Sequence, residues 1–131
     1  MKKMIIISGG FVDDKRVDIF DVALNEFRTA PPLNYGRWEH STCCKSEKVF
    51  VVGGLGVGSQ IMPIESLNIY TDQAWSVIAE SCELLRREKS AITAVNDTHI
   101  VIFGGKRDQK LLNDGVVLDT RNGTLKPILG S

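Results

Sequence analysis

Short apolar runs that end in a pair of glycines recur three times along the chain. They occupy residues 4–10, 49–54 and 100–105, and their first glycines lie 44 and 51 residues apart. Each run is rich in Ile, Val and Phe and lies between segments rich in Gly, Asn and Asp. Runs of this length and composition predict β-strands rather than helices, about eleven of them in the whole chain.

Two further pieces accompany the glycine pairs in a fixed order. Downstream come a second strand-like segment, a polar turn and one large apolar residue, marked by Phe20 and Phe27, then Tyr70 and Trp75, then Leu118 and Leu125. Upstream of the second and third pairs, Arg37 and Arg86 each stand four residues before a serine. Three features in one order at one approximate period indicate an internal repeat. Residues 81–89 predict a single helical turn in a loop.

The strands that lead into the glycine pairs are apolar at almost every position. A strand has this pattern when both faces of its sheet are buried. Stacking one repeat on the next achieves such burial, and a unit of about 50 residues with four strands is typical of a β-propeller blade. A β-sandwich is the alternative, although its strands alternate more regularly between apolar and polar residues. The glycines mark turns with positive φ or close backbone approach; they are Gly9, Gly10, Gly53, Gly54, Gly104 and Gly105.

The combined motif resembles the Kelch repeat. The second unit is its best copy, with Arg37, His40, the glycine pair, Tyr70 and Trp75 in the expected order. The resemblance implies an all-β fold, a segment of a Kelch-type β-propeller made of four-stranded antiparallel blades. It also implies that the strand near the Arg–Ser segment is innermost and the Trp strand outermost. We expect blade 1 at about 1–32, lacking its innermost strand, blade 2 at about 37–80 and blade 3 at about 86–129.

Fewer than three blades do not close a ring, because propellers have about four to eight. An exposed blade face covers about 300 Å². Leaving it in water forfeits about 8 kcal/mol at about 25 cal/mol per Å². We therefore expect the ring to be completed by self-association or by the remaining blades of a longer propeller.

Composition narrows the class of protein. The chain has 131 residues, 43% of them hydrophobic, which fits one globular domain. Sixteen basic and sixteen acidic side chains cancel, so we expect no nucleic-acid partner and no membrane partner bound by bulk charge. No apolar run approaches the roughly 20 residues of a membrane span. Three cysteines do not make a disulfide framework, which favours a cytoplasmic location.

Groups for catalysis are scarce in the sequence. Only two histidines are present, His40 and His99, and no common metal, phosphate-loop or nucleophile motif occurs. On a strand, Cys43 and Cys44 point to opposite faces and are expected to pack as small hydrophobic residues. We expect no catalytic residue, no metal and no cofactor. The alternatives are a fragment of a sugar-handling or oxidase-like propeller enzyme, or a truncated product without independent function.

Protein binding is the favoured function, as a Kelch-repeat interaction module or scaffold. The Kelch resemblance places partner contacts on loops after the glycine pairs (11–16, 55–64 and 106–114) and between blades (29–39 and 80–89). Candidate contact residues in these loops are Tyr35, Arg37, Trp38, Arg86, Arg87, Lys106, Arg107 and Lys110. Arginine binds carboxylates in bidentate fashion, which suggests a partner protein with an acidic segment. Alternatively, Arg37 and Arg86 hydrogen-bond neighbouring turns as part of the framework.

Overall fold

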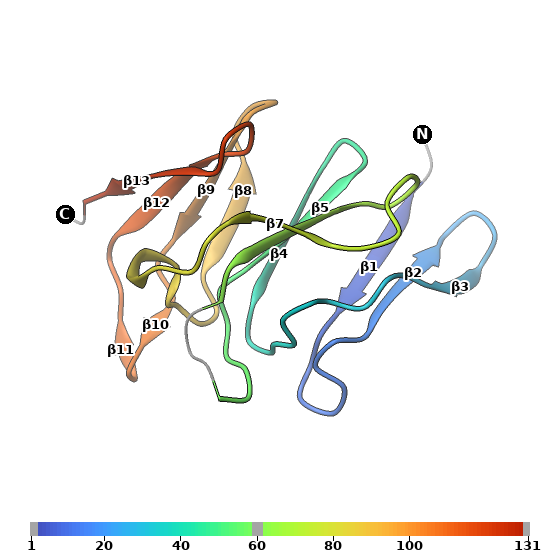
Figure 1. Ribbon diagram of the computed structural model, residues 1–131, viewed down its shortest axis with the longest axis horizontal. Coiled ribbons are helices and arrows are strands. Elements are labelled where there is room, and N and C mark those ends of the chain that lie inside the picture. The colour runs from blue at the N-terminus through green and yellow to red at the C-terminus, as the bar shows by residue number, and fades with distance from the viewer. Residues whose placement is uncertain (1–2, 59–61, 130–131) are drawn as a thin grey trace.

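The computed structural model describes residues 3–58 and 62–129, which form three antiparallel blade sheets and a separate two-stranded hairpin (Figure 1). Blade 1 contains β1 (Met4–Ser8), β2 (Val17–Asp21) and β3 (Glu26–Thr29). Blade 2 contains β4 (Ser41–Lys45), β5 (Lys48–Val52), β6 (Ile64–Asn68) and β7 (Ser76–Ala79). Blade 3 contains β8 (Ala91–Ala94), β9 (His99–Phe103), β12 (Gly115–Asp119) and β13 (Thr124–Ile128). A small hairpin of β10 (Lys106–Arg107) and β11 (Lys110–Leu111) lies between β9 and β12.

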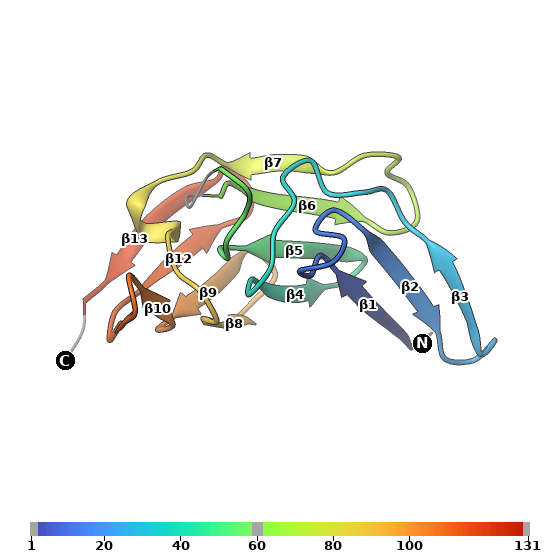
Figure 2. The ribbon, with the colours of Figure 1, turned by 90° about the horizontal axis from the view of Figure 1, so that it is seen from below.

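The three sheets are arranged like a fan, with blade 2 packed between blades 1 and 3, rather than as two layers (Figure 2). Strands β4 and β8 contact each other at the narrow side of the fan, and β3, β7 and β13 spread along the wide side. The strands of blades 2 and 3 pair in chain order from innermost to outermost, and in blade 3 β12 follows β9 across the small hairpin. This arrangement confirms the predicted Kelch-type propeller segment and excludes the sandwich. The expected helical turn is the short 3-10 helix Glu83–Leu85.

The middle blade is buried on both faces, as the apolar pattern predicts. On β5, Val49 and Val51 pack against Val17 and Ile19 of blade 1. The alternate residues Phe50 and Val52 pack in a second cluster against Ile100, Ile102, Val116 and Leu118 of blade 3. A sheet sandwiched in this way needs apolar residues at every position of its central strand, and each of these β5 side chains is at most 3% exposed.

Trp75 lies between blades 1 and 2, near the outer edge. It is 4% exposed, and its Nε1 donates a hydrogen bond to the carbonyl oxygen of Pro31 at 2.7 Å. The strand register shows that Tyr70 is not the residue that accompanies Trp75 in the repeat. Phe20 pairs with Phe27 and Leu118 pairs with Leu125, while Ser66 pairs with Ser76. Leu67 therefore holds the position assigned to Tyr70, which lies half-exposed in the turn after β6.

The first two glycine pairs join their blades to the segments that lead into the next blades. Gly53 has φ +69°, and a Cβ there would stand 2.5 Å from the carbonyl oxygen of Arg87, closer than atoms approach. The next amide, of Gly54, donates to that same carbonyl at 2.9 Å. Gly10 donates in the same way to the carbonyl of Arg37 at 3.0 Å. The two bonds identify Arg37 and Arg87 as equivalent residues of the repeat.

Candidate interaction surface

The loops that the sequence singles out emerge at one end of the fan, the lower end in Figure 1. Backbone bridges connect neighbouring loops there, between Trp38 and Leu55 and between Glu88 and Lys106. Within the loop at 55–64, residues 59–61 lie outside the described part of the chain. The short turns 46–47, 69–75, 95–98 and 120–123 lie at the opposite end. We call the first of these ends the loop end.

Large apolar side chains gather at the loop end, from three loops of two blades. We call Phe11, Val12, Tyr35, Trp38 and Val57 the loop-end patch. The rings of Phe11 and Trp38 meet edge to face, with centroids 5.4 Å apart. Phe11 is 82% exposed and Val57 85%. The Tyr35 and Val57 loops touch, because a Cβ on Gly56 would stand 2.7 Å from the carbonyl oxygen of Gly36.

Sequence reasoning named Tyr35 and Trp38 of this patch and missed Phe11, Val12 and Val57. The available signal was that these apolar residues stand in short loops directly after a glycine pair, where a buried strand has already ended. Only the packing of neighbouring loops shows that Phe11 meets Trp38 and that the loop of Val57 touches the loop of Tyr35.

Arg37, a candidate contact residue, has a fully buried side chain. Its Nη2 pairs with Glu65 Oε2 at 2.9 Å and donates to the carbonyl of Pro63, while Nη1 donates to the carbonyl of Gly53. Burial lowers the pKa of this guanidinium, and the Glu65 carboxylate opposes that effect. Arg37 therefore holds the loop, the glycine pair and β6 together, and its side chain is closed to a partner.

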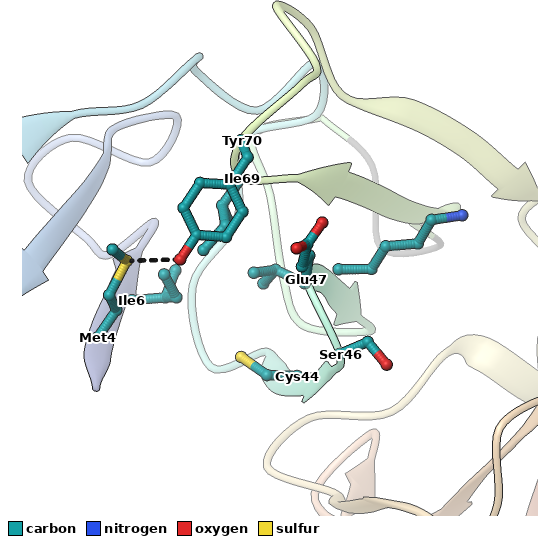
Figure 3. A pocket seen from close by; sticks show the side chains of 9 residues that line it. Met4, Ile6, Cys44, Ser46, Glu47, Ile69 and Tyr70 are labelled. Carbon is teal, nitrogen blue, oxygen red and sulfur yellow. Dashed lines mark hydrogen bonds between the residues drawn. The ribbon is translucent and has the colours of Figure 1, made fainter. Parts of the chain in front are cut away.

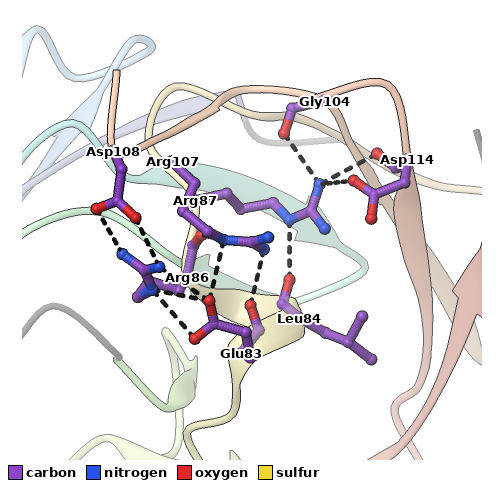
Figure 4. Close-up of polar contacts among 8 residues, drawn as sticks. All are labelled: Glu83, Leu84, Arg86, Arg87, Gly104, Arg107, Asp108 and Asp114. Carbon is purple, nitrogen blue, oxygen red and sulfur yellow. Dashed lines mark hydrogen bonds and ion pairs between the residues drawn. The ribbon is translucent and has the colours of Figure 1, made fainter. Parts of the chain in front are cut away.

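The framework position in blade 3 belongs to Arg87 and not to Arg86, which corrects the predicted alignment. Arg87 is 1% exposed and donates to the carbonyl oxygens of Leu84, Gly104 and Asp114 (Figure 4). The equivalent acceptors around Arg37 are the carbonyl oxygens of Tyr35, Gly53 and Pro63. The position of Glu65 is taken in blade 3 by Val116, because Val116 pairs with Ile102 as Glu65 pairs with Val51. The carboxylate that pairs with Arg37 therefore has no equivalent at this position beside Arg87. Among the described residues, Arg87 Nη2 has no hydrogen-bond partner.

Arg86 and Arg107 form a polar network on the blade 3 loops (Figure 4). Arg86 pairs with Glu83 at 2.9 Å and with Asp108 at 3.0 Å, and these carboxylates, Asp108 first, raise its pKa above the ordinary value. Arg107 donates to the carbonyl oxygens of Arg86 and Glu83. A cavity of about 250 Å³ lies here, lined in part by Leu55, Arg86, Lys106 and Arg107. Leu55 thus joins this basic region to the loop-end patch.

Lys110 begins β11, directly after the hairpin turn, beside an exposed Leu111. Lys106 lies at its base, half-buried, near the Glu88 carboxyl. Burial and a hydrogen bond with Glu39 raise the pKa of Glu88. The loop end therefore combines exposed apolar side chains with lysine amines, while its guanidinium groups are engaged within the protein.

The two histidines contact neighbouring side chains. His40 Nε2 lies 2.9 Å from Ser8 Oγ, and burial together with the charge of Arg37 lowers the pKa of His40 to about 4. His99 Nε2 lies 3.7 Å from the carboxylate of Asp119. Burial raises the pKa of the Cys43 and Cys44 thiols. Across residues 3–58 and 62–129, no group of three or more His, Cys, Asp and Glu side chains is placed to hold a metal ion.

A larger cavity of about 620 Å³ lies away from the loop end, between blades 1 and 2 (Figure 3). Met4 and Ile6 of β1 line one side, and Cys44, Ile69 and Tyr70 line the other. Strands β5 and β9 each pair with an inner strand, β4 and β8, whereas β1 pairs with β2 alone in the described residues. The cavity lies beside that unpaired edge of β1.

Among the described residues, no helical segment has the length and hydrophobicity of a transmembrane span.

No protein-family model matches the chain. Its sequence is similar to human Kelch-like protein 38, with 27% identity over 103 residues, and to human Kelch-like protein 6, with 27% identity over 111 residues. It is 30% identical to human Kelch-like protein 24 over 71 residues. These matches cover 79%, 85% and 54% of the chain but only 17%, 17% and 12% of the relatives, so the chain spans about one sixth of their length or less. With the repeated glycine-pair strands and the fan of antiparallel blades, this similarity supports a Kelch-repeat family for the chain.

Proposed function

We propose that the chain is a non-catalytic protein-interaction module, or scaffold, that binds a partner protein through its loop end. The observation that carries the proposal is the loop-end patch, in which Phe11, Val12 and Val57 are more than 80% exposed and the ring of Phe11 packs on Trp38. Contiguous exposed apolar side chains mark interaction sites on soluble proteins, and aromatic anchors contribute much of the binding energy. The similarity to Kelch-like proteins supports the same class of activity.

The partner segment that fits this surface carries apolar side chains followed by acidic ones. The apolar side chains cover the loop-end patch, and carboxylates meet the amines of Lys106 and Lys110 beyond Leu55. Arg86 contributes little attraction, because Glu83 and Asp108 already neutralise it. Lysines at the rim of such a contact raise the association rate more than the affinity, and salt weakens their effect.

A library of short peptides displayed on phage tests this function with the purified chain. We expect selection to enrich sequences that combine apolar and acidic residues. Each of the substitutions Phe11→Ala and Trp38→Ala is expected to weaken the selected peptides by about tenfold or more, as loss of an aromatic anchor does. Lys106→Glu together with Lys110→Glu is expected to slow association and to reduce its salt dependence.

Tyr70→Ala is the matched control, since Tyr70 is a half-exposed aromatic residue away from the loop end. The Tyr70→Ala variant is expected to bind the peptides with the same affinity as the unchanged chain. A selection that enriches no sequence, or peptides weakened equally by Tyr70→Ala and Trp38→Ala, would contradict the proposal.

No specific observation favours the sugar-handling or oxidase-like alternative. His40 is paired with Ser8, His99 lies beside Asp119, and the thiols of Cys43 and Cys44 have raised pKa values. We also propose that the module acts in the cytoplasm, where its three free cysteines remain reduced.

A further inference from the structure

The face of blade 1 that points away from blade 2 is built from positions that are buried in the other blades. Strand register makes Ile5, Ile7, Phe20 and Phe27 the counterparts of Val49, Val51, Leu67 and Trp75. The blade 2 residues are between 0% and 4% exposed, because blade 1 covers them. In blade 1, Ile5 is 52% exposed, Ile7 49% and Phe27 65%. Blade 1 thus presents the contact face of a blade with no blade covering it.

Blade 3 presents the complementary face at the other side of the fan. Val101 and Phe103 on β9 are the counterparts of Phe50 and Val52 on β5. Those two β5 side chains are 3% and 0% exposed because they pack on blade 3. Phe103 is 39% exposed, and Val101 and Val117 beside it are only half-buried. The order of Phe and Val is reversed between β5 (Phe50, Val52) and β9 (Val101, Phe103), so the combined volume of the two side chains is the same.

We propose that two copies of this chain close one ring, with blade 3 of each copy packed on blade 1 of the other. Three blades lie below the range of about four to eight in which propellers close, and two copies supply six. A two-fold axis makes the two joints identical, which is the commonest symmetry of soluble oligomers. In each joint, Ile7 of one copy meets Val101 and Phe103 of the other, as the equivalent residue Ile102 of blade 3 packs with Phe50 and Val52 of blade 2 within the fan.

The area is sufficient for a stable dimer. Strands spaced about 4.8 Å apart, with about 3.3 Å per residue, give the two joints together about 1,100 Å² of buried face. This reaches the roughly 1,000 Å² expected of a biological interface. The joints are distinct from the loop end, so this proposal is independent of the proposed partner binding.

Light scattering coupled to size-exclusion chromatography of the purified chain tests the proposal. We expect a species of twice the mass of one chain. Ile7→Glu on the blade 1 face and Phe103→Lys on the blade 3 face are each expected to weaken the dimer by at least a hundredfold, leaving monomers with unchanged circular dichroism. Val12→Glu is the matched control, because Val12 is fully exposed at the loop end, and it is expected to remain dimeric.

Mixing the two monomeric variants gives the sharpest readout. A mixed dimer has one joint with the introduced carboxylate facing the introduced amine, and one joint of native sequence. We therefore expect the equimolar mixture to regain the dimer mass, and native mass spectrometry to find one copy of each variant. A monomeric native chain, a dimer insensitive to Phe103→Lys, or a mixture that stays monomeric would each overturn the proposal. The first outcome would assign the covering blades to the remainder of a longer propeller or to another polypeptide.

Discussion

Arg37 and Arg86 look alike in sequence, each four residues before a serine, yet they lie in opposite environments. Arg37 is buried against Glu65, and Arg86 is partly exposed between Glu83 and Asp108. Removing one partner of a buried ion pair leaves an uncompensated charge, whereas exposed pairs contribute little. The same guanidinium group should therefore affect stability very differently at the two positions.

We predict that Arg37→Gln lowers the free energy of unfolding by about 3–5 kcal/mol, because it leaves the Glu65 carboxylate buried without its partner. Arg86→Gln is the matched control and is expected to change it by less than about 1 kcal/mol. Urea denaturation followed by tryptophan fluorescence measures both. Equal effects of the two substitutions would show that the buried pair does not act as the framework described here.

His40 makes the stability depend on pH in a defined window. Its pKa is about 4 in the folded chain and 6.5 in the absence of the fold. The folded state therefore binds the proton more weakly than the unfolded state, and stability falls as pH drops from 6.5 towards 4. Allowing for partial exposure, we expect a loss on the order of 2 kcal/mol over this window.

Urea denaturation at a series of pH values tests this, with His40→Asn as the comparison. The substituted chain is expected to lack the slope between pH 6.5 and 4, while losses at lower pH, where carboxylates such as Asp119 are protonated, persist. Parallel curves for the two chains would mean that His40 does not carry the effect.

At the scale of elements, the sequence predicted the strands well, because a strand buried on both faces has a pattern that few other structures share. β5 is apolar throughout its buried part, and the structure places blades on either side of it. The short helical turn at Glu83–Leu85 was also predictable, since its segment lacks a long apolar stripe. Whether a segment forms a strand depends mainly on its own residues, and the sequence shows these directly.

Register and loop contacts were harder to predict. Arg86 and Arg87 are adjacent, so spacing alone cannot choose between them, and only the hydrogen bond from Gly54 to the Arg87 carbonyl decides. Aromatic character favours Tyr70 at the position that strand pairing gives to Leu67, and the irregular pairing between Ile64 and Glu65 obscures the residue count. The loop-end patch arises from contacts between blades, which no single segment reveals.

At the scale of the whole molecule, three blades expose two kinds of surface with separate roles. The outward faces of blades 1 and 3 are flat and carry positions that are buried elsewhere in the repeat. The loop end is irregular and combines aromatic side chains with lysines. With sixteen positive and sixteen negative side chains in total, attraction for a partner must come from local placement rather than from net charge.

The most direct test of the central claim is an amide chemical-shift map of the isotope-labelled chain, titrated with a peptide taken from the selection. The account predicts that shifts concentrate at residues 11–12, 35–38, 55–57 and 106–111, and that the cavity beside β1 stays unchanged. Shifts centred instead on Met4, Cys44 and Tyr70, with the loop end unaffected, would contradict it.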